Sequence, residues 1–194
     1  MIKRIFEVFF SIFILFLTIP LILVASLIIF FEDFQNPFFL QPRLGKNKKI
    51  FMIYKLRTMS PKAPQLGTHE VNSDLYLKSS YFIRKLKVDE LPQFFNVLKG
   101  EMSIVGPRPC LPSQNNLVDA RSMKGVFNFL PGITGISQLK NIMMDQEELQ
   151  ASVDSLYEKE EATTIYFYFY CIANTAIKLD RELKFLNSII SKYK

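Results

Sequence analysis

Two adjacent carboxylates, Asp89 and Glu90, open the segment of this chain that has the strongest potential for chemistry. Pro92 follows them, and proline is tolerated in the first turn of a helix because its missing N–H has no helical partner there. We therefore expect a helix that begins at Asp89 or Glu90 and continues to residue 98. The positive end of such a helix should favour the ionised carboxylates.

An acidic pair of this kind is suited to Mg²⁺, which typically binds one or two carboxylates together with the phosphate oxygens of a substrate. Guanidinium groups for phosphate oxygens are close in the sequence: Arg84 precedes the pair, and Arg108 stands between two prolines. The residues alone also allow a plainer interpretation. In it the two carboxylates only cap a helix, and Gly-Pro-Arg-Pro is a rigid turn.

Composition argues against several other chemistries. The 194 residues include one His and two Cys, so a metal site with several histidines is excluded. Any histidine-assisted nucleophile would depend on His69, which we expect to be a solvated loop side chain. Cys110 and Cys171 are far apart and form no Cys-x-x-Cys pair, so a reducing compartment is the simplest interpretation.

A long apolar segment precedes these residues and must affect where they are placed. Glu7 is the only charged residue between Ile5 and Phe31. A straight helix over this segment would be about 40 Å long, against about 30 Å for the hydrocarbon core of a bilayer. Pro20 should bend or break this helix and release the carbonyl near Phe16, and Thr18 is placed to satisfy a freed backbone group.

Basic residues flank the apolar segment on both sides. Lys3 and Arg4 precede it, and six more follow it: Arg43, Lys46, Lys48, Lys49, Lys55 and Arg57. Both ends therefore favour the cytoplasm by the positive-inside rule. Two half-helices that meet at Pro20 and return to the same face satisfy this rule. From the flanks and the proline alone, a kinked helix that spans the membrane once is equally compatible.

The charge of the chain is unevenly distributed. The overall net charge is +6, but the segment 43–124 contains fifteen basic and six acidic residues. The segment 140–161 contains two basic and seven acidic residues. The basic part should face anions, either lipid headgroups or a phosphorylated substrate. Nucleic acid is the weaker choice because of the apolar segment.

The remaining patterns predict a mainly α fold with a small β element, in the α+β class. The run from Ile50 to Arg57 is typical of a strand, and the proline-containing stretch from Ser60 to Ser73 is typical of a loop. Helices are expected at 74–87, 90–98, 113–123 and 145–161. The aromatic run Ile165–Ile177 is too short to span a membrane, and we favour a buried core helix over contact with the membrane interface.

Several blocks, in order and spacing, resemble the bacterial sugar transferases, specifically the small monotopic phosphoglycosyl transferases. The blocks are the apolar segment with its central proline, Phe39–Gly45, Tyr54–Met59, Asp89–Pro109, and Pro131–Gly135 with Gln138. The resemblance extends from residue 1 to about residue 138. The Asp89–Pro109 block is specific enough to favour catalysis over a simple cap.

The resemblance implies a fold, a location and a reaction. Residues 1–34 would form a re-entrant membrane helix with a break, and residues 35–194 a catalytic domain, with membrane-surface helices, on the cytoplasmic face of the bacterial inner membrane. The enzyme would move sugar-1-phosphate from a UDP-sugar to a polyprenyl (undecaprenyl) phosphate, releasing UMP and starting polysaccharide assembly. Its partners would be these two substrates and membrane lipids, with no nucleic acid.

The resemblance also assigns roles to residues. Asp89 would be the nucleophile that carries a covalent phosphosugar, and Glu90 would support the metal or the nucleophile, with Mg²⁺ at both carboxylates. The phosphate- and substrate-binding residues would be Lys55, Arg57, Arg84, Arg108 and Gln138.

The sequence departs from the family pattern at three places: Ile19 before Pro20, Leu130, and Ile142. The departures at Leu130 and Ile142 motivate a second hypothesis. In it the chain is a catalytically degenerate member that acts as a membrane scaffold in a polysaccharide-assembly complex.

Overall fold

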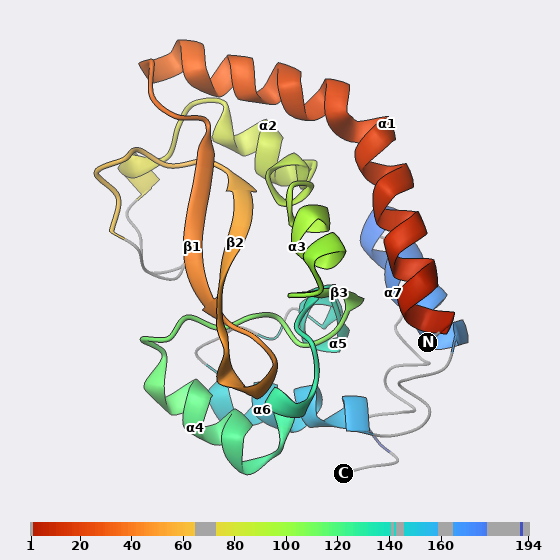
Figure 1. The fold of residues 1–194 in the computed structure, drawn as a ribbon. Coiled ribbons are helices and arrows are strands. Elements are labelled where there is room, and N and C mark those ends of the chain that lie inside the picture. The colour runs from red at the N-terminus through yellow and green to blue at the C-terminus, as the bar shows by residue number, and fades with distance from the viewer. Residues whose placement is uncertain are drawn as a thin grey trace. The chain divides into compact units, whose positions relative to one another are not determined.

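The computed structural model describes residues 2–64, 73–140, 142, 146–158, 165–177 and 191 of the chain (Figure 1). His69 lies outside the described residues. The chain divides into two compact units. The first consists of Met1–Pro42 and Met52–Gly100, and the second of Arg43–Phe51 and Glu101–Lys194.

The described residues are mainly helical with two small sheets, which confirms the predicted fold class. Strands β1 (Phe38–Leu44) and β2 (Ile50–Leu56) pair with each other, and η1 (Lys46–Lys48) connects them. The helices of the first unit are α1 (Ile2–Asp33), η3 (Ser73–Leu75), α2 (Ser80–Lys85), η4 (Val88–Glu90) and α3 (Gln93–Lys99). The second unit contains β3 (Ser103–Val105), α4 (Asn115–Met123), η5 (Val126–Asn128), β4 (Gly132–Thr134), α5 (Ile136–Leu139), α6 (Glu147–Ser155), η6 (Leu156–Glu158) and α7 (Ile165–Ile177).

Helix α1 is apolar on nearly its whole circumference. One face is buried against α3 and η4, through Glu7, Ser11, Leu15, Ile22, Ala25, Ser26 and Ile29. Large apolar side chains such as Phe13, Phe16 and Leu23 are exposed on other faces. By length and composition α1 could cross a membrane, and so much exposed apolar surface is typical of a protein that associates with one. The division into residues 1–34 and 35–194 stays a prediction.

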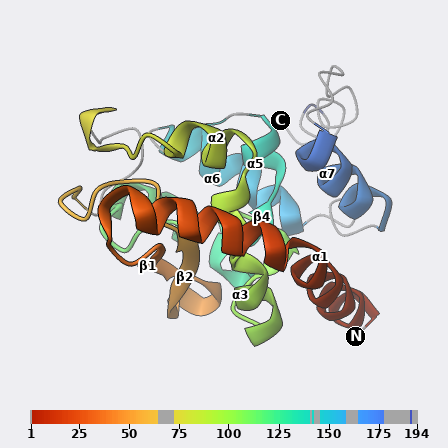
Figure 2. The same cartoon turned by 90° about the horizontal axis from the view of Figure 1, so that it is seen from above.

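The predicted break in α1 takes the form of a bend in one continuous helix, with Pro20 inside it. The change of direction is visible in two views (Figures 1 and 2). Thr18, expected to satisfy a freed backbone group, donates its hydroxyl to the Ile14 carbonyl at 2.7 Å. A helical threonine hydroxyl reaches the carbonyl four residues earlier, a contact that itself tends to bend helices.

The N-terminal end of α1 is attached to the C-terminal end of α3. The Arg4 guanidinium donates to the carbonyls of Val97 and Leu98 at 2.6 and 3.2 Å. It also lies 3.7 Å from the buried carboxylate of Glu7. A cation suits this place, because the last carbonyls of a helix have no helical partner and carry partial negative charge.

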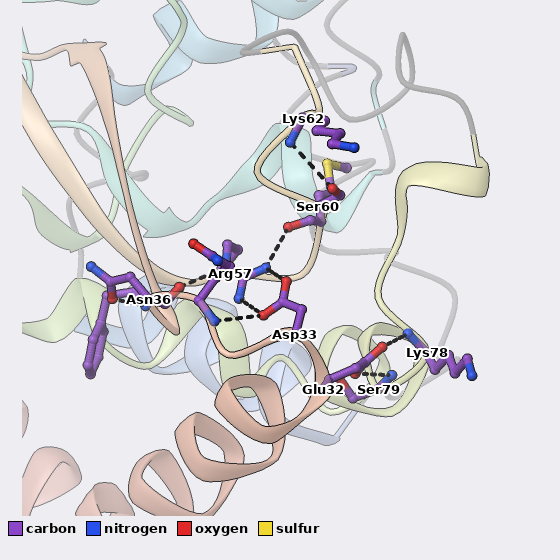
Figure 3. A network of polar contacts seen from close by, with 11 residues as sticks. Glu32, Asp33, Asn36, Arg57, Ser60, Lys62, Lys78 and Ser79 are labelled. Atoms are coloured by element: carbon purple, nitrogen blue, oxygen red, sulfur yellow. Dashed lines mark hydrogen bonds and ion pairs between the residues drawn. The ribbon is translucent and has the colours of Figure 1, made fainter.

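The C-terminal end of α1 is attached to the same unit through two adjacent carboxylates (Figure 3). Asp33 binds both terminal nitrogens of Arg57, each at 2.7 Å, just after the end of β2. Glu32 accepts the backbone N–H groups of Lys78 and Ser79, directly before α2. Both ends of the apolar helix are therefore held by polar contacts within the first unit.

A buried asparagine joins α3 to β2. Asn96 accepts the backbone N–H of Tyr54 at 3.0 Å and donates to the Met52 carbonyl at 2.8 Å. An amide side chain that bridges two backbone groups in this way fixes both the position and the rotation of a short helix. It sets the position of α3, and hence of the turn before it, relative to β2.

Several element boundaries differ from those predicted from the sequence. The helix expected at 74–87 is the short turn η3 followed by α2. The helix expected at 145–161 is α6 followed by η6, with 145 and 159–161 outside the described residues. Strand β2 ends at Leu56, one residue earlier than expected. Strands β1, β3 and β4 were not predicted.

The second unit contains a parallel pair of strands that brings two glycines together. Ser103 pairs with Gly132 and Val105 with Thr134. A Cβ atom on Gly132 would overlap the backbone of Gly106, and one on Gly106 would lie 2.5 Å from the Leu130 carbonyl oxygen. These two positions therefore require glycine because the two backbones approach so closely.

Helix α7 is a core helix, as favoured from the sequence. Phe167, Tyr168 and Cys171 are buried, and the Tyr168 hydroxyl lies 3.2 Å from the Ser103 hydroxyl on β3. Cys110 is buried as well. Phe169 on the same helix is exposed, so the core contains one side of this aromatic run.

The two-bond ion pair between Arg57 and Asp33, called the clamp below, leads to a first prediction. Arg57→Met leaves the Asp33 carboxylate without its bidentate partner and removes the 2.7 Å bond from Arg57 to the Asn36 carbonyl. We expect a loss of about 2–3 kcal/mol, somewhat less than for a fully buried pair because Asp33 is partly exposed. In detergent micelles the midpoint of thermal unfolding should fall by roughly 5–10 °C.

Lys62→Met is the matched control, since Lys62 is an exposed cation a few residues further along the chain. Its unfolding midpoint should stay within about 1 °C of the wild type. Equal midpoints for both variants would show that the clamp does not stabilise the fold.

Candidate active site

Asp89 and Glu90 lie in the 3₁₀ turn η4, not in the first turn of α3 as predicted. Pro92 explains this difference. In an α-helix the Val88 carbonyl would accept the N–H of residue 92, but proline has none, and the carbonyl accepts the Leu91 N–H at 3.2 Å instead. Helix α3 therefore begins only at Gln93, and the dyad projects from the turn that precedes it.

Asp89 is a buried carboxyl group, with only 8% of its surface exposed. Burial, together with the neighbouring charge of Glu90, raises the pKa of Asp89 to about 6. Lys55 and Arg84 counteract this increase but do not cancel it. The expectation that a helix end would favour the ionised form is therefore corrected: desolvation dominates, although the group is still mostly ionised at pH 7.

Two cations accompany the dyad. The Lys55 ammonium lies 3.2 Å from a carboxylate oxygen of Glu90, and both side chains are largely buried. The Arg84 guanidinium stacks on the Tyr76 ring at 4.9 Å and is close enough to stabilise the Asp89 charge. Of the candidate site residues, the structure thus brings together Asp89, Glu90, Lys55 and Arg84 from β2, α2 and η4.

The dyad has the donor chemistry that Mg²⁺ prefers. Asp89 and Glu90 supply hard carboxylate oxygens, and the repulsion between them is what a divalent cation would relieve. Among the described residues, no group of three or more His, Cys, Asp or Glu side chains could hold a metal ion.

Arg57, predicted to bind phosphate, has a different environment. Besides Asp33 it donates to the carbonyls of Asn36 and Met59, and it is buried. These contacts occupy its guanidinium in holding the end of α1 to the end of β2. They favour a structural role over the predicted contact with phosphate.

Arg108 and Gln138 belong to the second unit. Arg108 is half-buried, and its carbonyl accepts a hydrogen bond from Arg121 at 2.7 Å. The side-chain amide of Gln138 is buried, and its oxygen and nitrogen have no hydrogen-bond partner within the described part of the chain. A buried amide in this state is suited to a polar ligand, which keeps Gln138 a candidate.

A fully buried ion pair supports both of these segments and was not predicted. Arg121 binds Asp154 at 2.5 Å, and Asp154 also accepts the hydroxyl of Ser137, the residue before Gln138. The Tyr157 hydroxyl accepts the backbone N–H of Ile136 at 2.9 Å. Asp154 and Tyr157 carried a sequence signal, the Asp-x-x-Tyr pattern near the C-terminus, whereas nothing distinguished Arg121.

A buried carboxylate dyad with two cations, in a unit built on a long apolar helix, is typical of a membrane-associated protein that handles phosphates. Comparison with known proteins makes this more specific. The chain belongs to the bacterial sugar transferase family, whose profile matches residues 1–181.

Individual relatives agree with this family. The UDP-N-acetylgalactosamine-undecaprenyl-phosphate N-acetylgalactosaminephosphotransferase of Aeromonas hydrophila is 40% identical over 62% of this chain and 29% of its own length. The UDP-glucose:undecaprenyl-phosphate glucose-1-phosphate transferase of Caulobacter vibrioides is 32% identical over 76% of this chain and 57% of its own. The uncharacterized sugar transferase EpsL of Bacillus subtilis is 30% identical over 98% of this chain and 94% of its own length. The chain thus spans less than two thirds of the length of the first two of these relatives.

The raised pKa of Asp89 predicts how its replacement affects stability. An acid whose pKa is higher in the folded protein than in the unfolded chain costs stability above its folded pKa, and this cost disappears as the pH falls below its unfolded pKa. With the pKa raised from 3.8 to about 6, Asp89→Asn should stabilise the protein at pH 7 by roughly 2–3 kcal/mol. At pH 4 the gain should be below about 0.5 kcal/mol.

Thermal unfolding at several pH values, with metal chelated, measures this difference. Asp119→Asn, at an exposed position of α4, is the control, and its effect should stay within about 0.5 kcal/mol at every pH. A stability gain for Asp89→Asn that does not change with pH would contradict the assignment of a raised pKa.

Proposed function

We propose that this protein is a phosphoglycosyl transferase that moves sugar-1-phosphate from a UDP-sugar to a polyprenyl phosphate, the undecaprenyl carrier of its relatives. The observation that carries the proposal is the buried Asp89–Glu90 dyad with Lys55 and Arg84 around it. Membership of the family and the printed names of the relatives support the same reaction. The product would start the assembly of a polysaccharide.

The chemistry has two displacements at one phosphorus atom. A carboxylate oxygen of Asp89 bonds to the phosphorus attached to the sugar, and the bond between the two phosphates of the donor breaks, releasing UMP. An oxygen of the polyprenyl phosphate then bonds to the same phosphorus, and the bond to Asp89 breaks. Each step exchanges one P–O bond for another, and the carboxylate is regenerated.

The local electrostatics suit these steps. With a pKa of about 6, Asp89 is largely ionised at neutral pH and is a more basic nucleophile than an ordinary aspartate. Lys55 and Arg84 provide positive charge for the phosphate oxygens, and phosphoryl transfer depends mainly on positioning and charge neutralisation. When bound, Mg²⁺ would be held by Asp89 and Glu90 and would neutralise the charge of the diphosphate.

The membrane topology is part of the same proposal. The apolar helix α1 would enter the cytoplasmic face of the inner membrane, turn near Pro20 and return. The support is that Arg4 at one end and Asp33 at the other both contact the unit that carries the dyad. A helix that crossed the bilayer once would leave one of these charged ends on the far side.

A panel of UDP-sugars assayed for UMP release in the presence of polyprenyl phosphate tests the reaction. We expect release with at least one donor, and loss of at least about 10³-fold in turnover for Asp89→Asn, which removes the nucleophile. Mass spectrometry should find the phosphosugar on the peptide that contains Asp89.

Two controls make this test specific. Asp119→Asn should keep wild-type turnover, and a chelator should lower it, with recovery on addition of Mg²⁺. Retention of full turnover by Asp89→Asn would disprove the covalent step. Binding of polysaccharide-assembly proteins without UMP release from any donor would favour a scaffold.

Labelling of single cysteines in intact cells tests the topology. A cysteine added before Lys3 and one at the exposed Lys62 should both be protected from a membrane-impermeant reagent until the cells are opened. Because the two native cysteines are buried, background labelling should be low. Labelling of the N-terminal cysteine alone from outside would mean a single full span.

A further inference from the structure

The first unit contains an apolar groove beside the dyad. It has a volume of about 600 Å³ and is lined by Phe38, Phe39, Leu40, Tyr54, Lys55, Pro92, Phe95, Leu98 and Lys99. The size lies in the range of small-molecule binding sites, about 300–1,000 Å³. Its lining is formed almost entirely by carbon, with Phe38, Leu40 and Phe95 each nearly half exposed.

The groove runs along one face of α3. Phe95 and Lys99 are four residues apart and therefore share a face of α3. Pro92 lines the groove directly before the helix, and β1 and β2 supply the opposite wall. Asn96 holds these two walls together through its bonds to β2. The apolar surface is thus built on fixed elements, and within the described part of the chain Phe38, Leu40 and Phe95 remain partly exposed on it.

One end of the groove reaches the dyad. Lys55 lines the groove and lies 3.2 Å from Glu90, and Pro92 lines it two residues after Glu90. Its only charged lining residues are cations, Lys55 and Lys99, the latter stacked on the Tyr54 ring at 5.2 Å. The groove therefore fits a ligand with a long apolar body and an anionic end.

We propose that this groove binds the isoprenoid chain of the polyprenyl phosphate next to its phosphate, with the phosphate directed to Lys55 at the dyad. The inference rests on the proposed function, because it assigns the groove to the acceptor substrate. A nucleotide sugar fits the lining poorly. Its base and hydroxyl groups need several hydrogen-bonding side chains, and the Tyr54 hydroxyl is the only neutral one in the lining.

Phe95 and Phe82 provide a matched pair of variants to test the assignment. Both are exposed aromatic residues on short helices of the first unit, but only Phe95 lines the groove. Phe95→Ser should raise the KM for undecaprenyl phosphate about tenfold, because it removes apolar surface from the chain-binding wall. The KM for the UDP-sugar should change less than about twofold, and Phe82→Ser should leave both constants near wild type.

A binding experiment separates failure of this inference from failure of the proposed function, because it needs no turnover. Full-length protein in detergent is photolabelled with farnesyl phosphate that carries a diazirine in its second isoprene unit. Label should appear in the peptides that contain residues 38–40 and 92–99, and unlabelled undecaprenyl phosphate should compete for it. Phe95→Ser should reduce the label severalfold, and Phe82→Ser should not.

Other outcomes overturn the inference. Competition by the UDP-sugar in place of the prenyl phosphate would assign the groove to the donor. Equal competition by phosphatidylglycerol would make it a general lipid contact. Label confined to peptides outside the groove would place the isoprenoid chain elsewhere, even if UMP release proves the proposed reaction correct.

Discussion

The fold of the first unit depends on how a long apolar helix is held at both of its ends. Apolar side chains are exposed over most of α1, and only one face of the helix is buried, so polar contacts at its termini help to set its position. Arg4 satisfies the last carbonyls of α3, and Asp33 forms a two-bond ion pair with the buried Arg57. Each contact gives a charged group hydrogen bonds in place of the hydration that it loses on burial. Between them the bend at Pro20 lets one helix reach both anchoring points.

The dyad is positioned by the same set of contacts. The buried face of α1 packs on η4 and α3, and Asn96 fixes α3 to β2, which carries Lys55. Burial raises the pKa of Asp89, so the folded protein tolerates an unfavourable charge at this place. The proposed role of Asp89 would account for this loss of stability, because a fully solvated carboxylate is a weaker nucleophile. Lys55 and Arg84 limit the cost without removing it.

The sequence predicted the features that depend on local chemistry and missed those that depend on distant contacts. A charge-free run with one proline indicated α1, and an Asp-Glu pair near several cations indicated the dyad. Strand β1 was missed because Pro42 lies inside it, and a proline argues against a strand unless the strand is at an edge. The start of α3 was placed too early because the effect of Pro92 on the Val88 carbonyl was not considered. The pair of Arg121 and Asp154 joins residues 33 positions apart, and no local pattern indicates such a contact.

The sequence blocks that resemble the family contain residues whose identities have different physical causes. Asp89, Glu90 and Lys55 form a cluster whose charges and burial are suited to chemistry on phosphates. Gly106, in the same Asp89–Pro109 block, and Gly132, in the Pro131–Gly135 block, owe their identities to the contact of two backbones across β3 and β4. Arg121 and Asp154 then fix the segments that follow these strands, which carry Arg108 and Gln138. Leu130 and Ile142, where the sequence departs from the family pattern, lie beside these contacts: the Leu130 carbonyl lies next to Gly106, and the Ile142 N–H donates to the Ser137 carbonyl at 2.9 Å. Both contacts are made by backbone atoms, so neither requires a particular side chain at these two positions.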